Sequence, residues 1–225
     1  MTVLDTAPVS RPDVVIFDCD GVLVDSERLI QEVDLELIRD LGWPITRAEI
    51  FAEHLGRSED AVIANIERRL GRAVPAGFRH QKAAAYEAVL RERLVAVPGV
   101  ADAITVLRAG GMRMCVASSA QHSRIRLSLG LTGLQTLFAD EHLFSAEDVA
   151  RGKPAPDLFL HAAAGLAAPP RACVVVEDSP AGVEAAQAAG MRVIGYCALT
   201  PAGLLAGADA LITRMTDLPA VIATV

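Results

Sequence analysis

The segment VVIFDCDGVLVDS, residues 14–26, joins an apolar run to a pair of carboxylates. The run at 14–17 is short, β-branched and aromatic, which predicts a buried strand. Asp18 and Asp20, one residue apart at the end of that strand, project toward the same side of the chain. Burying two like charges together costs free energy unless a cation or an incoming group compensates, so the pair indicates a divalent-cation site. A turn at Asp20 and Gly21 is the alternative that the segment alone leaves open.

Further short apolar runs recur along the chain and alternate with helical patterns. They lie at 112–117, 173–176, 193–196 and 210–213. This alternation predicts an α/β fold, a doubly wound parallel sheet with helices on both faces. The helix after the run at 173–176 has readable ends, because Ser179 suits an N-cap, Pro180 the first helical position and Gly190 a left-handed residue at the C-terminus.

The first two predicted strands lie too far apart for a single βαβ crossover, which predicts an inserted domain. An apolar stripe at helical spacing follows the first strand: Leu29, Ile30, Val33, Leu37 and Leu41. Thr46 and Glu49 form a capping box for a second helix, and Ser58 suits the cap of a third. We therefore expect an all-helical domain at 26–94, inserted into a core domain formed by 1–25 and 95–225.

Composition excludes several classes of partner. The chain has 225 residues and a net charge of −7, which disfavours binding to nucleic acid or to an anionic membrane. No apolar stretch approaches the ~20 residues of a membrane span, and the N-terminus MTVLDTAPVSRPD lacks a signal peptide, so we expect a cytoplasmic protein, with a monomer favoured. The cysteines are scattered without a C-x-x-C pair, which argues against zinc and disulfides: Cys19, Cys115, Cys173 and Cys197.

Polar side chains also follow later predicted strands. Ser118 and Ser119 come after the run at 112–117, and Glu177 and Asp178 after the run at 173–176, while Lys153 stands between Gly and Pro in RGKPAPD. The carboxyl edge of an open parallel sheet is where ligands bind, which favours one shared site. Taken singly, each signal has a plain structural alternative: a helix N-cap for the serine, a solvated lysine, and a helix-start acidic pair.

Together, in this order, these motifs resemble those of the haloacid dehalogenase superfamily, in its branch of phosphatases and β-phosphoglucomutase-like proteins with a helical cap. The resemblance implies that Asp18 is a nucleophile toward phosphorus and Asp20 a general acid/base. It also implies that Ser118, with Ser119 beside it, binds the phosphoryl group and that Lys153 neutralises it. Mg²⁺ would be held by Asp18, the backbone carbonyl of Asp20, Asp178 and, directly or through water, Glu177.

The resemblance further implies a magnesium-dependent phosphatase that acts on a small phosphorylated metabolite such as a sugar phosphate, through an aspartyl-phosphate. The segment HLGRSEDAV, residues 54–62, resembles the cap loop that reaches the substrate, which makes Arg57 and His54 candidates for selectivity. A solvated arginine near a helix start is the alternative. Ile30 stands where β-phosphoglucomutase has a histidine, which favours hydrolysis over the alternative, phosphoryl transfer between sugar phosphate positions.

Three other classes remain for comparison. A haloacid dehalogenase proper needs neither Asp20 nor the metal carboxylates. A phospho-accepting receiver has its acidic pair early, its acceptor aspartate on a later strand and no helical insert. A catalytically idle binding protein is disfavoured because every motif position is filled.

Overall fold

Within residues 12–54 and 57–225, which the computed structural model describes, six strands form one parallel sheet in the order β3-β2-β1-β4-β5-β6. The strands are β1 (Val14–Phe17), β2 (Arg113–Ser118), β3 (Leu143–Ser145), β4 (Cys173–Glu177), β5 (Arg192–Tyr196) and β6 (Ala210–Ile212). All neighbours pair in parallel. The predicted α/β fold with a doubly wound parallel sheet is confirmed.

The first apolar run forms a central strand, as its composition predicts. β1 pairs with β2 on one side and β4 on the other, with Val14 opposite both Arg113 and Cys173. All four residues of β1 are fully buried. The strand predicted at 112–117 runs one residue later, so Ser118 is its last residue, and β3 was missed because three residues carry too little pattern.

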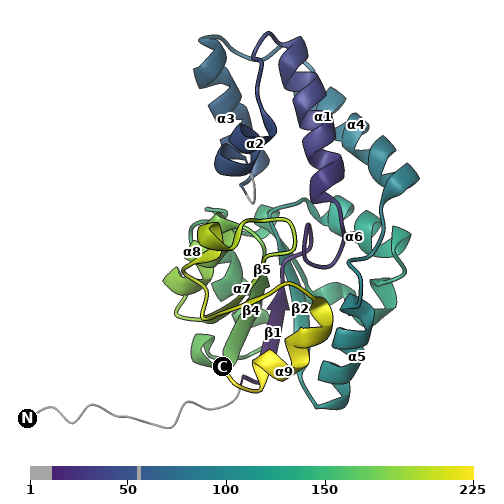
Figure 1. Cartoon of the computed structure of the whole chain (residues 1–225), viewed down its shortest axis with the longest axis vertical. Helices are drawn as coiled ribbons and strands as arrows, with labels where there is room; N and C mark the ends of the chain where they lie inside the picture. Colours follow the sequence, from purple (N-terminus) through teal and green to yellow (C-terminus); the bar gives the residue numbers. More distant parts are fainter. Residues whose placement is uncertain (1–11, 55–56) are drawn as a thin grey trace, which may run out of the picture.

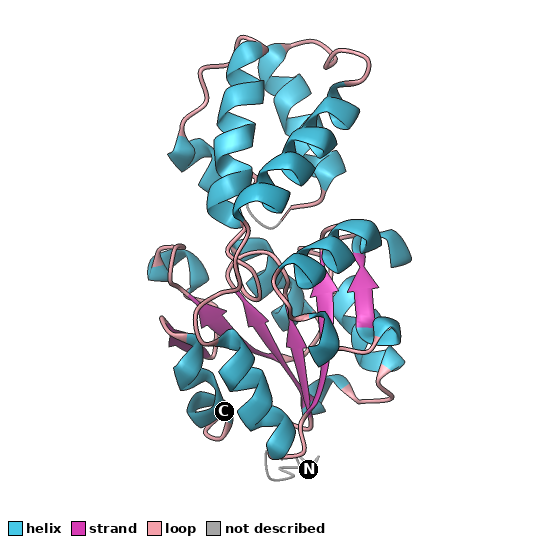
Figure 2. Cartoon of the chain, turned by 90° about the vertical axis from the view of Figure 1, so that its right-hand side faces the viewer, coloured by secondary structure: helices cyan, strands magenta, loops and turns pink. Residues whose placement is uncertain are grey.

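Helices cover both faces of the sheet (Figure 2). Alternate residues of β1 enter two different apolar clusters: Val15 and Phe17 pack with α5 (Val100–Ala109), α6 (His122–Leu131) and α9 (Leu218–Ile222). Val14 and Ile16 pack with α7 (Asp157–Gly165) and α8 (Pro180–Ala188). Short 3₁₀ helices lie at Gln135–Leu137, Asp140–His142, Ala146–Asp148, Pro170–Ala172, Ala202–Leu205 and Met215–Asp217.

The predicted ends of α8 are confirmed. Ser179 is its N-cap and accepts a hydrogen bond from the backbone N–H of Gly182 at 3.0 Å. Pro180 is its first residue, and Gly190 has a φ of 70°. These caps place the start of α8 directly after the acidic end of β4.

Four helices lie between β1 and β2: α1 (Glu27–Asp40), α2 (Arg47–Glu53), α3 (Glu59–Leu70) and α4 (Phe78–Arg93). They gather beyond the carboxyl ends of the strands (Figure 1). The predicted capping box at Thr46 and Glu49 is present, and Ser58 caps α3. The helices share an apolar cluster of their own: Leu35, Leu37, Ile38, Trp43, Ile45, Ile50, Val62, Ile63, Ile66 and Phe78. The domain boundaries at 26–94 remain a prediction.

The stripe predicted for α1 is only partly buried. Leu29 and Leu37 are buried, but Ile30, Val33 and Leu41 are half-buried. Ile30 is half-buried because it lines a cavity between the insert and the sheet edge. In the part of the chain that the structure describes, no helix is long and apolar enough to cross a membrane.

We predict that Ile66→Ala destabilises the insert. Ile66 is fully buried in its apolar cluster, and truncating such a side chain costs about 2–5 kcal/mol. Trp43 is the chain's one tryptophan and belongs to the same cluster, so its fluorescence reports on unfolding of the insert in urea. We expect its transition to shift to lower urea by more than the far-UV circular dichroism transition.

Leu204→Ala is the matched control, because Leu204 is 47% exposed and its truncation should change stability by only about 0.5 kcal/mol or less. Coincident transitions by both probes in Ile66→Ala would show that 26–94 does not unfold as a unit of its own.

Candidate active site

The ammonium group of Lys153 joins the carboxyl ends of three neighbouring strands. Its Nζ lies 2.6 Å from Oδ1 of Asp18, which follows β1, and 2.6 Å from Oε1 of Glu177, which ends β4. It also donates to the carbonyl oxygen of Ala117 in β2 at 3.1 Å. Lys153, Asp18 and Glu177 are all buried. The structure therefore brings these predicted residues into direct contact and rejects the solvated-lysine alternative.

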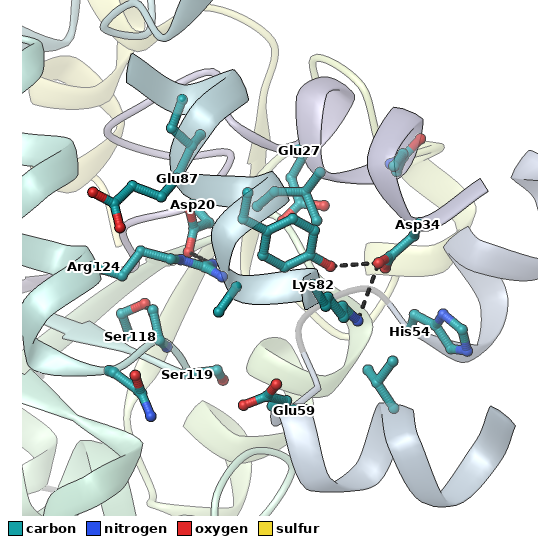
Figure 3. Close-up of a pocket in the computed structure, with 18 of the residues that line it drawn as sticks. Asp20, Glu27, Asp34, His54, Glu59, Lys82, Glu87, Ser118, Ser119 and Arg124 are labelled. Atoms are coloured by element: carbon teal, nitrogen blue, oxygen red, sulfur yellow. Dashed lines mark hydrogen bonds and ion pairs between the residues drawn. The ribbon is translucent and has the colours of Figure 1, made fainter. Parts of the chain in front are cut away.

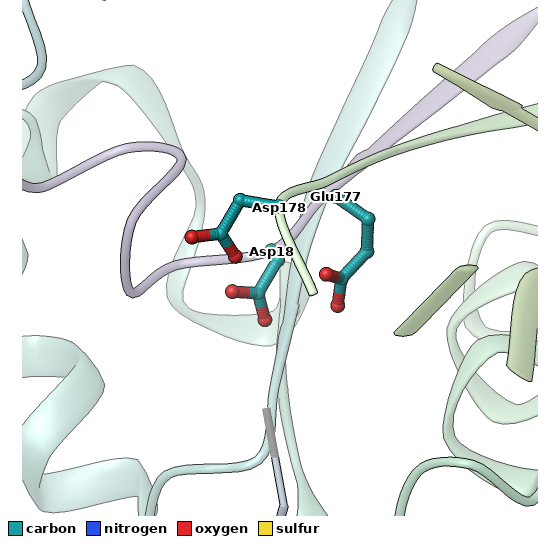
Figure 4. Close-up of side chains that lie close together, drawn as sticks. All are labelled: Asp18, Glu177 and Asp178. Carbon is teal, nitrogen blue, oxygen red and sulfur yellow. The ribbon is translucent and has the colours of Figure 1, made fainter. Parts of the chain in front are cut away.

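Asp18, directly after β1, lies beside Glu177 and Asp178 at the acidic end of β4 (Figure 4). Gly21 has a φ of 81°, and its N–H donates to the carbonyl oxygen of Val24 at 2.8 Å. A Cβ atom at Gly21 would lie 2.0 Å from Oδ2 of Asp178. Only glycine meets both the backbone and the space requirement, so Asp178 packs directly on the loop after β1.

Two partners hold Asp20, and neither was predicted as a site residue. The hydroxyl of Ser26 donates to Oδ1 of Asp20 at 2.6 Å, and the guanidinium of Arg124, on α6, makes an ion pair with Oδ2. Ser26 is the last residue of the segment VVIFDCDGVLVDS, which also contains Asp18 and Asp20. Sequence reasoning could therefore have singled it out. Arg124 could not, because nothing in the sequence distinguishes it from Arg126 on the same helix.

Ser118 is not a helix cap. α6 begins at His122 with Gln121 as its N-cap residue, whereas Ser118 is the buried last residue of β2. Its Oγ accepts a hydrogen bond from the backbone N–H of Ala120 at 3.1 Å. Ser118 and Ser119 both line the cavity that opens above Asp18.

Asp18, Glu177 and Asp178 form an acidic cluster in which one oxygen of each lies within 4.8 Å of the others. The oxygens of Glu177 are already engaged: Oε1 by Lys153, and Oε2 by the N–H and hydroxyl of Ser179, both at 2.8 Å. Within residues 12–54 and 57–225 the buried carboxylate of Asp178 has no hydrogen bond or ion pair. The oxygen donors and the unpaired Asp178 fit a hard divalent cation.

The electrostatics of the cluster point the same way. Burial raises the pKa of Asp18 to about 7, although Lys153 opposes the shift. Burial, and then the charge of Glu27, raises the pKa of Asp178 well above its ordinary range. Burial alone would lower the pKa of Lys153, but Asp18 and Glu177 outweigh it and raise it. The ammonium therefore stays charged, and the cluster still holds more negative charge than one lysine balances.

A cavity of about 470 Å³ lies between this cluster and the helical insert. Asp18, Asp20 and Asp178 line one end. Arg57, of the loop predicted to reach the substrate, also lines it and is exposed. His54 lines it too, with its Nε2 held 3.0 Å from Oδ1 of Asn65. Positions 55–56 of that predicted loop lie outside the described residues.

The insert contributes polar groups that sequence reasoning missed. Asp34, Lys82 and Tyr86 line the cavity, and Asp34 pairs with the Lys82 ammonium and accepts a hydrogen bond from the Tyr86 hydroxyl (Figure 3). Glu27, at the start of α1, lines it near Asp20, and burial raises its pKa to about 8. Lysine is mostly a surface residue, so its position on α4 gave no sign of burial in the sequence.

A family model described as haloacid dehalogenase-like hydrolase matches residues 12–190. The chain belongs to this family. It is 31% identical to 6-phosphogluconate phosphatase of Escherichia coli (strain K12) over 84% of this chain and 85% of that protein. It is 30% identical to hexitol phosphatase B of the same strain over 80% of this chain and 81% of that protein.

Among solved structures, a haloacid dehalogenase-like protein from Agrobacterium tumefaciens has a TM-score of 0.81 and 37% identity, covering 95% of this chain and 98% of that chain. Family membership confirms the predicted resemblance and removes the receiver alternative. Similarity to named phosphatases over most of the chain supports a phosphomonoester hydrolase.

We predict that Gly182→Ala disrupts the haloacid dehalogenase-like site. A Cβ atom there would lie 1.8 Å from Oε1 of Glu177, so the carboxylate would have to leave Lys153. Separating one partner of a buried ion pair costs about 3–5 kcal/mol, which outweighs the ~1 kcal/mol that alanine contributes over glycine in a helix. Thermal unfolding should therefore show a net loss of stability.

Gly203→Ala is the control, because a Cβ atom there would meet no other atom of the described residues within 4 Å, apart from its chain neighbours and its own helix backbone. It should leave the melting temperature nearly unchanged. A Gly182→Ala protein as stable as the control would contradict the tight packing of Glu177 against α8.

Proposed function

We propose that the chain is a magnesium-dependent phosphatase that hydrolyses a small phosphorylated metabolite, in particular a sugar phosphate, through a phosphoryl group carried on Asp18. The observation that carries the proposal is the contact of the Asp18 carboxylate with the buried Lys153 ammonium at the end of a substrate-sized cavity. The substrate class rests on relatives named for phosphogluconate and hexitol phosphates.

In the first step an oxygen of Asp18 attacks phosphorus, and the bond from phosphorus to the ester oxygen breaks. The carboxyl group of Asp20 gives its proton to the departing oxygen, which leaves as an alcohol. In the second step Asp20 takes a proton from water as the water oxygen attacks phosphorus. Inorganic phosphate and the free Asp18 carboxylate result. Ser26 and Arg124 hold the Asp20 side chain from two sides.

Lys153 and Ser118 would stabilise the phosphoryl group while it is transferred. The Lys153 ammonium offsets negative charge on Asp18 and on the phosphoryl oxygens. Because the Ser118 oxygen accepts from Ala120, its own O–H is free to point at a phosphoryl oxygen, and Ser119 lies beside it at the cavity wall.

Magnesium suits the donors at this edge of the sheet. The carboxylates of Asp18 and Asp178 and the backbone carbonyl of Asp20 would hold it. Glu177, whose oxygens bind Lys153 and Ser179, would reach it through water. When bound, the ion supplies Lewis-acid neutralisation of phosphoryl charge.

The helical insert would serve as a cap over the cavity, excluding water and selecting the substrate. Arg57 is exposed on its loop and is proposed to contact the part of the substrate distant from phosphorus, and the buried His54 also lines the cavity. Ile30 lines the cavity where an imidazole would stand in β-phosphoglucomutase. An apolar group there supports hydrolysis over transfer between sugar phosphate positions.

We expect hydrolysis of p-nitrophenyl phosphate to require magnesium or a similar divalent cation. The excess of buried carboxylate over ammonium motivates this, since the cation would balance it. Excess EDTA should abolish phosphate release and added magnesium should restore it, with circular dichroism showing an unchanged fold. Full activity in the chelator would remove the metal from the proposal.

We expect Asp18→Asn to abolish turnover in a folded protein, because an amide is nearly isosteric but a poor nucleophile. A rate below about a hundredth of wild type is expected when a covalent nucleophile is lost. Phosphate release from p-nitrophenyl phosphate with magnesium measures it. An Asp18→Asn variant that kept a higher rate would reassign the nucleophile.

A further inference from the structure

Arg124 lies on α6, on the core side of the cavity, and its guanidinium pairs with Oδ2 of Asp20 (Figure 3). The Asp20 side chain is only 10% exposed. A charge-assisted pair in so sheltered a place is stronger than a surface pair and holds the carboxylate in one orientation. Arg126, on the same helix, instead pairs with Asp140 at the surface, where the two side chains are 45% and 66% exposed.

The Arg124 guanidinium is held by Asp20 and by one aromatic ring. Its central carbon lies 5.7 Å from the centroid of the Tyr86 ring, and the Tyr86 hydroxyl is fixed by Asp34 at 2.5 Å. Its Nε is buried and has no hydrogen-bond partner within residues 12–54 and 57–225. A buried N–H without a partner costs about 1–3 kcal/mol. The fold therefore tolerates a penalty to keep this guanidinium against Asp20.

The two oxygens of Asp20 have different kinds of partner. Oδ1 accepts a hydrogen bond from the Ser26 hydroxyl at 2.6 Å, and Oδ2 faces Arg124. A hydroxyl both donates and accepts and can rotate, whereas a guanidinium carries donors only. Oδ1 can therefore carry a proton beside a compatible neighbour, while a proton on Oδ2 would meet the N–H groups of Arg124. The pairing leaves Oδ1 as the oxygen that exchanges a proton.

The proton transfer from Asp20 then has one route. As the bond from phosphorus to the ester oxygen breaks, the proton on Oδ1 passes to the departing oxygen, and the electron pair of the former O–H bond stays on Asp20. The carboxylate that results is the form that Ser26 and Arg124 hold in this structure. Resting on the phosphatase function proposed above, we propose that Arg124 is a positioning residue for Asp20, which anchors Oδ2 and so keeps Oδ1 available to the leaving oxygen.

Phenyl phosphate and p-nitrophenyl phosphate test this role because they have nearly the same shape. The phenoxide ion is a much stronger base than the p-nitrophenoxide ion, so its departure depends more on a proton from Asp20. The value of kcat/KM reports on the steps up to departure of the leaving group. The ratio of the two kcat/KM values, with magnesium present, therefore measures how well Asp20 is placed.

Arg124→Met removes the cation and keeps an unbranched side chain. It should lower kcat/KM on phenyl phosphate by about tenfold or more beyond its effect on p-nitrophenyl phosphate, since a well-placed general acid contributes about 10²–10⁴-fold. Arg126→Met is the matched control, because it removes an arginine of the same helix from a surface pair. Its ratio should equal that of the wild-type protein.

Misfolding cannot imitate this result. A smaller folded fraction lowers both rates alike and leaves their ratio unchanged. If Arg124→Met does not fold at all, Arg124→Gln, which keeps a polar group but no charge, replaces it, and its ratio should move in the same direction.

A double variant separates positioning from direct contact with the ester. Asp20→Asn leaves an amide that cannot act as the acid, so adding Arg124→Met to it should not shift the ratio further. A further shift would show that Arg124 acts on the ester itself and would overturn the positioning role.

The outcomes also separate this proposal from the proposed function. A wild-type protein inactive on both esters would overturn the phosphatase function. An active wild-type protein, with an Arg124→Met ratio that matches that of Arg126→Met, would overturn the positioning role of Arg124 alone.

Discussion

The buried ammonium of Lys153 is the interaction on which the site depends. It contacts a carboxylate after β1, a carboxylate at the end of β4 and a carbonyl in β2, so one side chain ties together three adjacent strands of the sheet. Removing it would leave two buried carboxylates facing one another, which costs about 3–5 kcal/mol for a single broken pair. The Lys153 ammonium therefore both stabilises the packing of the sheet edge and sets the charge of the acidic cluster there.

The same interaction explains why the site needs further positive charge. One ammonium cannot balance Asp18, Glu177 and Asp178, and the raised pKa values of Asp18 and Asp178 express that deficit. The proposed divalent cation and the proposed phosphate-binding groups lie at this end of the cavity. The opposite end, built by α1 and α4, pairs its cations with carboxylates and so presents a different chemistry. In the proposed function, phosphoryl transfer takes place at the sheet edge, and the helical insert contacts the leaving group.

The sequence predicted the fold and most of the acidic site because both depend on local pattern. Every strand except the three-residue β3 carries its own apolar run. The carboxyl ends of parallel strands meet at one edge, which brings Asp18 to Glu177 and Asp178. Lys153 was reached only through the family resemblance, since its partner Asp18 is 135 residues away. Arg124 was missed because its pairing with Asp20 spans 104 residues and has no local signal. The pairing of Asp34 with Lys82 was missed for the same reason. It is created by the packing of α1 against α4, and in the sequence each residue looks like an ordinary solvent-exposed helix residue.

The central claim is that Asp18 carries the phosphoryl group during turnover. Rapid acid quenching of the enzyme with magnesium and an active phosphate ester, followed by peptide mapping by mass spectrometry, tests it directly. The account predicts one added phosphoryl group on the peptide that contains Asp18, present during turnover and gone once substrate is consumed. A phosphoryl group on another residue, or turnover with no phosphorylated peptide at any quench time, would contradict it.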